Sequence, residues 1–180
     1  SFEEIEKLNK ETISAKGTNM YDLKNQPEIV DGIALNEALL KSGKADATYY
    51  LGWTYLESDK KATMDEYEKI LENTQNPDAI KEQKVIYGIA TESTHLRTFP
   101  SPIAIWDDPN DTDLDYQYLS AVRVNEPVVI TSKSKDGKYY LAKNICCSGW
   151  IKAEYVAICK DKDEWISAWD IKNEDALVVW

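Results

Sequence analysis

Residues 128–158 read VVITSKSKDGKYYLAKNICCSGWIKAEYVAI, and this stretch decides the fold class. Short apolar runs rich in β-branched and aromatic residues alternate in it with turn residues, which is the pattern of a small β-barrel or sandwich. The turn segment 134–138 contains an Asp-Gly pair, which supplies the positive-φ position of a hairpin. The sequence therefore predicts strands at 128–131, 139–142, 149–151 and 155–158.

The residues before this stretch change from one periodicity to another near residue 85. Residues 85–90 (VIYGIA) predict one more strand, whereas the chain before them is helical in pattern. Thr63 and Glu66 have the spacing of a capping box and predict a helix start. A further short helix is expected to open at Pro27 and to close at Gly43, and residues 2–10 also have helical spacing.

The residues after the stretch predict one short helix and one strand. Residues 161–169 (DKDEWISAW) are helical in pattern, and residues 175–180 (DALVVW) read as a strand that either returns to the barrel or leads to a next domain. The expected class is α+β, with a helical arm over 1–85 packed on a small β-barrel over 86–160. Residues 161–180 form the C-terminal helix and strand.

The charge of the chain limits its partners. Lys and Arg total 21 against 32 Asp and Glu, so the net charge is −11. This field repels a phosphate backbone or an anionic lipid surface, which excludes nucleic acid as a partner and leaves a peptide or a neutral sugar. No run of apolar residues is long enough to predict a membrane span. Because Ser1 is followed directly by a helical pattern, we expect a chain from which a signal peptide has been removed.

Several short motifs resemble a known domain. They are residues 94–101 (THLRTFPS), Gln117, residues 126–129 (EPVV), 136–139 (DGKY) and 148–151 (SGWI). Together they resemble the bacterial SH3-like domain that precedes the catalytic domain of NlpC-type cell-wall cysteine peptidases, and residues 9–87 resemble the helical segment before it. The structural motif residues that carry the resemblance are Arg97, Phe99, Pro100, Gly149 and Trp150.

The resemblance implies a peptidoglycan-processing protein of the cell envelope or the extracellular space. The parent enzyme would hydrolyse a γ-D-glutamyl bond in the stem peptide, and its catalytic domain would follow Trp180. That chemistry needs a Cys thiolate activated by a His base. Here Cys147 precedes Ser-Gly as the family's nucleophile does, but Cys146 stands where the family has Asp. The single histidine, His95, lies upstream of Cys147, whereas the family's base lies downstream. We therefore expect no catalytic residue in this chain.

The cysteines and the acidic loop offer no clear cofactor site. Cys146, Cys147 and Cys159 are expected to be free thiols. Asp111, Asp113 and Asp115 have the first spacings of an EF-hand, but Tyr116 replaces its Gly and Val122 its bidentate Glu. A solvated loop is the preferred interpretation, with calcium binding or a glycosidase-like carboxylate pair as alternatives. We expect no metal and no cofactor.

Aromatic residues are the remaining candidates for ligand binding. Trp106, Tyr116, Tyr118 and Tyr139 fall in or near the expected loops and hairpin, where their rings could stack on sugar or apolar peptide groups. Each of them could instead fill the core. Arg97 is expected to fix a loop through a carboxylate or carbonyls.

Three functions remain open at this point. The preferred hypothesis is a non-catalytic module that binds the stem peptide and positions it for a catalytic partner domain. The alternatives are a spacer that only packs against the hydrolase domain, and a free-standing cell-wall hydrolase.

Overall fold

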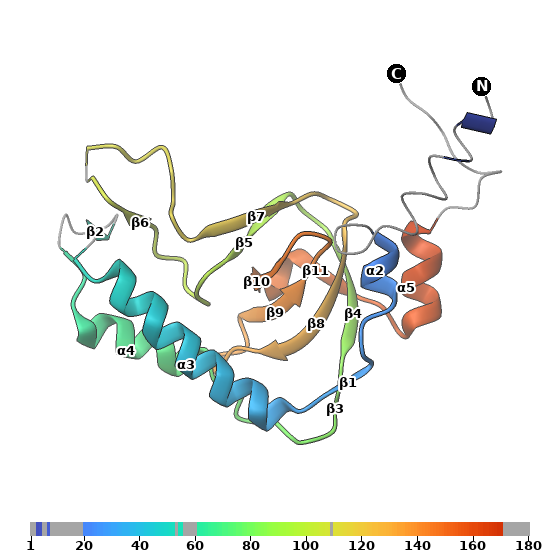
Figure 1. Cartoon of the computed structure of the whole chain (residues 1–180), viewed down its shortest axis with the longest axis horizontal. Coiled ribbons are helices and arrows are strands. Elements are labelled where there is room, and N and C mark those ends of the chain that lie inside the picture. Colours follow the sequence, from blue (N-terminus) through green and yellow to red (C-terminus); the bar gives the residue numbers. More distant parts are fainter. Residues whose placement is uncertain are drawn as a thin grey trace.

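The computed structural model describes residues 3–4, 7, 20–52, 54–55, 61–108 and 110–170. Helices come first, an antiparallel sheet follows and a short helix closes the described chain, so the predicted α+β class is confirmed (Figure 1). The helices are α2 (Met20–Lys24), α3 (Gly32–Tyr50), α4 (Met64–Asn73) and α5 (Lys162–Trp169), with a 3-10 turn at Ala153–Tyr155. No helix in the described part of the chain has the length and apolar character needed to cross a membrane.

Seven strands form the main sheet, in the spatial order β11-β4-β8-β9-β10-β5-β7. They are β4 (Ile86–Ala90), β5 (Thr94–Arg97), β7 (Tyr118–Val122), β8 (Pro127–Lys133), β9 (Tyr139–Lys143), β10 (Ser148–Lys152) and β11 (Val156–Ile158). All of their pairings are antiparallel. Two small ribbons accompany the sheet and pair β1 (Ile29–Val30) with β3 (Gln83–Lys84), and β2 (Thr54–Tyr55) with β6 (Ile105–Trp106).

The sheet curls so that its two edges share one interior. Leu96 and Val122 from the β5–β7 edge pack in the same buried cluster as Val156 from β11 at the opposite edge. Ile130 and Ile151 from the central strands complete this barrel core. Closing an antiparallel sheet in this way buries apolar side chains of every strand against one another.

The hairpin between β8 and β9 confirms the predicted turn. Gly137 has a φ of 72°, a conformation that glycine adopts without steric penalty. Ser134 donates its hydroxyl to Asp136 Oδ1 at 2.6 Å, and the same oxygen accepts the Lys138 backbone N–H at 3.0 Å. The turn therefore holds its own polar groups and fixes the register of both strands.

Helices α3 and α4 cover one outer face of the barrel (Figure 1). The capping box predicted for α4 is present, because Thr63 and Glu66 exchange side-chain and backbone hydrogen bonds. Tyr67 and Leu71 on the inner side of α4 pack on Phe99, which follows β5. The helical arm and the barrel thus share a core.

The boundaries predicted for the preceding helix are wrong at both ends. Residues after Pro27 are extended and form β1, and Asp31 caps α3 by accepting the Ile33 and Ala34 N–H groups. Gly43 lies inside α3 and does not end it. A Cβ at this position would lie 2.6 Å from Leu71 Cδ2, so the glycine allows α3 and α4 to pack closely.

Helices α2 and α5 cover a second face of the barrel. Leu23 of α2 and Trp165 of α5 are buried with Val85 and Val129, and Trp165 Nε1 donates to the Gly88 carbonyl at 3.0 Å. The C-terminal helix predicted at 161–169 is confirmed. The strand predicted at 175–180 lies outside the described residues, as does most of the helix predicted at 2–10.

Candidate functional site

A buried arginine fixes the segment that leads from β5 to β7. Arg97 Nε donates to the Ser101 carbonyl at 2.9 Å and Arg97 Nη2 donates to the Ile103 carbonyl at 2.9 Å. Arg97 Nη1 lies 2.9 Å from Asp115 Oδ2, and both side chains are almost fully buried. The planar guanidinium can satisfy several acceptors in one fixed geometry, as expected from the sequence.

Asp115 and Gln117 extend this arrangement to the rest of the segment. Asp115 Oδ1 accepts the backbone N–H groups of Ile105 at 3.1 Å and Gln117 at 2.9 Å. The fully buried Gln117 side chain accepts the Phe99 N–H and donates to the Ile103 carbonyl. Both ends of the long segment are therefore tied to one buried polar network, which gives it a defined shape.

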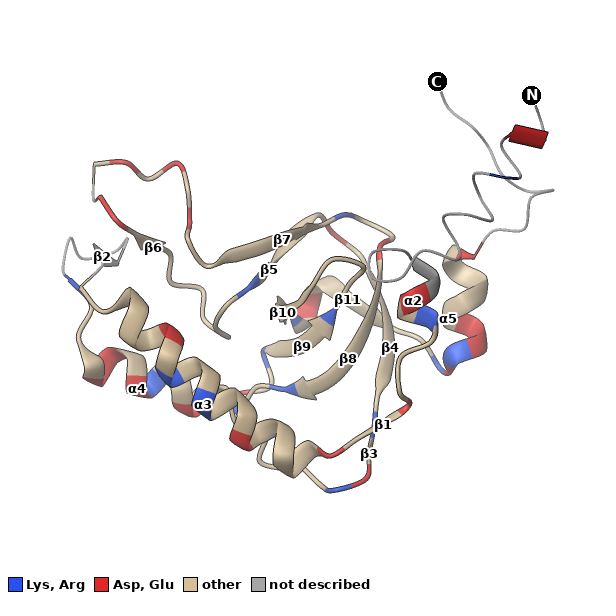
Figure 2. Cartoon of the chain, in the orientation of Figure 1, with Lys and Arg blue, Asp and Glu red and all other residues tan. Residues whose placement is uncertain are grey.

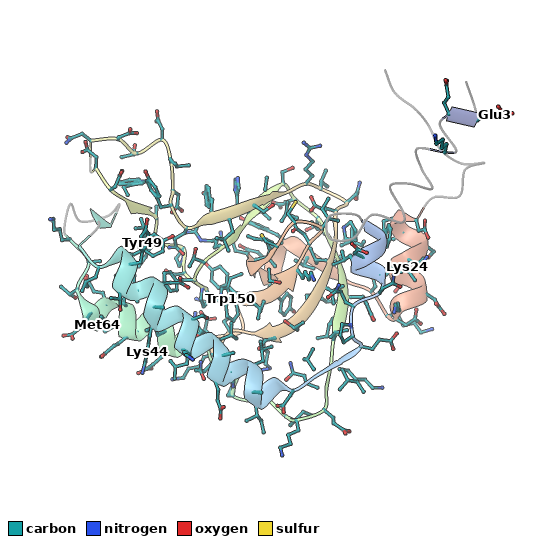
Figure 3. The ribbon with its side chains drawn as sticks, viewed as in Figure 1. Glu3, Lys24, Lys44, Tyr49, Met64 and Trp150 are labelled. Carbon is teal, nitrogen blue, oxygen red and sulfur yellow. The ribbon has the colours of Figure 1, made fainter. Side chains whose placement is uncertain are left out.

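The other motif residues serve packing. Gly149 allows β10 to approach β5, because a Cβ there would lie 3.0 Å from the Arg97 carbonyl oxygen. Trp150 lies between α3 and the sheet (Figure 3) and packs with Leu35 and Leu39 of α3. Pro100 is buried, and its carbonyl accepts the Asn73 side chain at 2.8 Å.

The structure separates the four aromatic candidates into two pairs. Trp106 and Tyr139 are each only 4% exposed and belong to the interior. Tyr118 is 44% exposed, and its ring stacks on His95 with centroids 4.0 Å apart, while the Arg97 guanidinium lies 5.2 Å from its centroid. Tyr116 is half-buried, and its hydroxyl donates to Asp107 Oδ2 at 3.1 Å. Tyr116 and Tyr118 are thus the candidates that a ligand could reach.

A third tyrosine, which the sequence did not single out, joins them from α3. Tyr49 is 68% exposed. The pKa of Tyr116 is raised by its hydrogen bond to Asp107, by burial, by the charges of Asp107 and Asp111 and, least of all, by Tyr49. Its neighbour Tyr50 donates its hydroxyl to the Tyr116 carbonyl at 3.1 Å and so ties the end of α3 to this segment. We call Tyr49, Tyr116 and Tyr118 the tyrosine surface. Only the packing of α3 on the barrel brings Tyr49 here.

The loop between β6 and β7 is largely exposed, and acidic residues recur along it (Figure 2). Asp108 Oδ1 accepts the N–H of Asn110 at 2.8 Å, and Asp111 Oδ1 accepts the N–H of Asp113 at 3.4 Å. Asp115 is committed to Arg97, so it cannot serve as the third ligand of an EF-hand-like site. Within the described residues, no three His, Cys, Asp or Glu side chains are grouped as a metal site would require.

The cysteine thiols and the His95 imidazole lie in different surroundings. All three thiols are free, and Cys147 sits in the β9–β10 turn against the barrel core. Burial raises the pKa of the Cys147 thiol, and Cys146 adds to the rise. Cys147 packs against the barrel core, whereas the His95 ring stacks on Tyr118, and no hydrogen bond joins these two described residues.

In the part of the chain that the structure describes, two large grooves lie where helices meet the barrel. The first, which we call the helix groove, has a volume of about 840 Å³ and runs between α3 and the sheet. Leu35, Leu39, Leu119 and Trp150 give it an apolar lining, and Asp46 on its border has a pKa raised by burial.

The second groove, which we call the hairpin groove, lies between α4, the β8–β9 turn and the 3-10 turn. Its volume is about 940 Å³. Pro100, Pro102, Ile70 and Tyr139 contribute apolar surface to it. Sequence patterns gave no sign of either groove, because each is lined by elements that are distant in the chain.

Comparison with known proteins agrees with this architecture. Residues 104–152 match the model of the SH3 domain of SH3b1 type. A solved structure of an NlpC/P60 endopeptidase from Photobacterium damselae subsp. piscicida superposes with a TM-score of 0.56 and 21% sequence identity. The match covers 74% of this chain and 32% of that one, so the chain spans about a third of the length of this structural relative. No curated protein matches the sequence. Residues 104–152 are therefore similar to an SH3 domain of the SH3b1 type, and the chain shares its fold with part of an NlpC/P60 endopeptidase.

Proposed function

We propose that this chain is a non-catalytic module that binds the peptidoglycan stem peptide and positions it for a hydrolase domain of the same parent protein. The observation that carries the proposal is the tyrosine surface held on a buried polar scaffold. Tyr118 is exposed directly above Arg97, whose guanidinium fixes the segment that bears Tyr116 and Tyr118. Rigid aromatic side chains bind sugar or peptide groups with little loss of conformational entropy.

Among the residues that the structure describes, no cysteine thiol is hydrogen-bonded to His95, which supports a binding role over a catalytic one. Cys147 is partly buried with a raised pKa, which lowers its thiolate fraction, and His95 is stacked on Tyr118. A module of this kind contributes to specificity by making contacts to the correct substrate and by blocking one side of the cleft to others. The parent protein would then hydrolyse γ-D-glutamyl bonds with residues of a further, C-terminal domain.

The likeness to an NlpC/P60 endopeptidase supports the choice of substrate and place of action. Bacterial SH3 domains of this type are typical of cell-envelope proteins and bind cell wall. We therefore place the protein in the cell envelope or outside the cell, with the stem peptide and the catalytic domain as its partners.

Retention on purified, insoluble peptidoglycan tests the proposal. We expect the isolated chain to sediment with the cell wall, and a Tyr116→Ala/Tyr118→Ala variant to stay largely in the supernatant. If the wild-type chain also stays in the supernatant, the protein is a spacer that only packs against the hydrolase. If the chain alone releases new amino groups from the cell wall, it is an enzyme and the proposal is wrong.

A further inference from the structure

We infer that the hairpin groove binds a carboxylate of the ligand, most directly the free α-carboxylate that a γ-linked D-glutamyl residue carries. The inference rests on the proposed function and adds a second contact point to the tyrosine surface. Its basis is the local charge. The groove is bordered by Lys69, Lys135, Lys138 and Lys152 and by three acidic residues, so it carries a small positive charge in a chain of net charge −11.

Two of the four lysines are available to a ligand. Lys135 Nζ pairs with Glu72 at 3.2 Å, and Lys152 Nζ lies 3.6 Å from Glu154 and 3.3 Å from the Tyr155 hydroxyl. By contrast, in the part of the chain that the structure describes, no carboxylate lies within ion-pairing distance of the ammonium groups of Lys69 or Lys138. These two side chains come from α4 and from the hairpin turn, on different walls of the groove.

Asp136, two residues before Lys138, is already engaged by the turn. Burial acts to raise the pKa of Asp136, but hydrogen bonds from Ser134, from the Lys138 backbone and from Asn73, together with the positive charge of Lys138, outweigh it and lower that pKa. The carboxylate of Asp136 is therefore stabilised as an anion mainly by hydrogen bonds of the turn, to which the charge of the Lys138 ammonium group adds the smallest contribution. An incoming carboxylate can then interact with that ammonium.

The walls of the groove are fixed before any ligand arrives. Asn73 joins them, because its side chain donates to the Pro100 carbonyl at 2.8 Å and accepts the Asp136 N–H at 3.1 Å. The Asn73 carbonyl also accepts the Lys135 N–H at 2.9 Å, and on the opposite side the Ala153 N–H donates to the Lys138 carbonyl at 2.8 Å. Binding to such a preformed groove avoids the entropic cost of ordering its walls.

The lining suits a small peptide better than an inorganic anion. The exposed Pro102 and the largely buried Ile70, Pro100 and Tyr139 line the groove together with its charged residues. A short acidic peptide with methyl side chains can place its carboxylate between Lys69 and Lys138 and its apolar groups on this surface. The stem peptide has this chemistry around its γ-D-glutamyl residue.

Amide-resolved NMR titration of the whole chain tests the inference. The probe is a synthetic L-Ala–γ-D-Glu–L-Lys peptide, compared with the same peptide in which the glutamyl α-carboxyl group is an amide. We expect the acid form to shift the amide signals of Asn73, Gly137 and Lys138, to bind about fivefold more tightly than the amide form, and to weaken as salt is added.

Lysine variants provide the matched comparison. Lys69→Gln/Lys138→Gln should weaken binding of the acid form about fivefold and leave binding of the amide form unchanged. Lys41→Gln/Lys44→Gln, on exposed positions of α3, makes the same change of charge away from the groove and should alter neither affinity. Both variants replace exposed side chains, and their spectra without peptide show directly whether the fold is intact.

The outcomes separate this inference from the proposed function. If the peptide shifts only the signals around the tyrosine surface, or if both peptide forms bind equally well, the hairpin groove is not a carboxylate site although the module still binds the stem peptide. If neither peptide shifts any signal, the proposed function and this inference both fail.

Discussion

Arg97 Nη1 lies 2.9 Å from Asp115 Oδ2, and this ion pair closes the base of the segment that carries the tyrosine surface. Only 11% of the Arg97 side chain and 8% of the Asp115 side chain are exposed. Removing one member of a buried pair leaves the other charge without compensation, which costs far more than losing an exposed pair.

The Arg97→Ala variant should therefore lose about 3–5 kcal/mol of unfolding free energy. Urea unfolding followed by tryptophan fluorescence measures this loss. Lys133→Ala removes an ion pair of similar length with Asp78, in which the side chains are 44% and 69% exposed, and should cost at most about 1 kcal/mol. Equal losses in the two variants would show that the Arg97 network does not hold the segment.

Binding of muropeptides should depend on the tyrosine surface. Replacing Tyr118 with Ala removes the ring and should weaken binding roughly tenfold, because an aromatic contact contributes about 1 kcal/mol or more. Tyr118→Phe keeps the ring and should retain most of the affinity, and Ile80→Ala, at an exposed position on another part of the surface, should have no effect. Calorimetric titration with soluble muropeptides gives the affinities, and unchanged values for Tyr118→Ala would contradict the assignment.

The three thiols should react with iodoacetamide at different rates. Cys146 is exposed, whereas burial raises the pKa of both Cys147 and Cys159. A raised pKa means less thiolate at a given pH, so near pH 7.5 alkylation should fall mainly on Cys146, and the share at Cys147 should grow as the pH rises above about 9. Mass spectrometry of the alkylated peptides reports the ratio. A Cys147 that reacts first at pH 7.5 would indicate an activated thiol and would reopen the enzymatic alternative.

The C-terminal helix should be part of the cooperative fold. Trp165 is fully buried, so Trp165→Ala should cost about 3–5 kcal/mol of unfolding free energy. Trp165→Phe keeps most of the apolar volume but leaves the Gly88 carbonyl without its donor, for a smaller loss of about 1–3 kcal/mol. Ile158→Ala, at a site 49% exposed, should stay within about 0.5 kcal/mol of the wild type. Thermal and urea unfolding should show one transition in each variant, and a separate early transition would mean that α5 unfolds on its own.

Local signals in the sequence located the elements that depend on local chemistry. The Asp-Gly turn, the capping box of α4 and the pattern of α5 each contain their own stabilising contacts, and all three elements are present. The boundaries of α3 were missed because they depend on tertiary packing. In a sequence, a glycine at this place indicates the end of a helix. In the structure Gly43 lies within α3, and its lack of a side chain permits close contact with Leu71.

The sequence could not show which aromatic ligand candidates are exposed and which are buried, because their burial also depends on tertiary packing. Tyr139 and Tyr140 are neighbours on β9 and point to opposite faces, so alternation predicts that one of them is exposed. Instead Tyr139 packs beneath the helices and Tyr140 packs against the barrel core, because both faces of this strand are covered. No sequence pattern singled out Tyr49, because its position near Tyr116 depends on where α3 crosses the barrel.

The meeting of α2 and α5 has a consequence for biosynthesis. Lys24 Nζ and Asp170 Oδ2 are 2.9 Å apart although 146 positions separate them, and Lys162 reaches back to Glu28 in the same way. While the ribosome is still translating the barrel, Leu23 and Val129 have no tryptophan to cover them. Nascent chains must therefore expose this apolar patch until α5 has emerged from the exit tunnel. Chains that are truncated before residue 165 keep the patch exposed, so we expect chaperones to retain them.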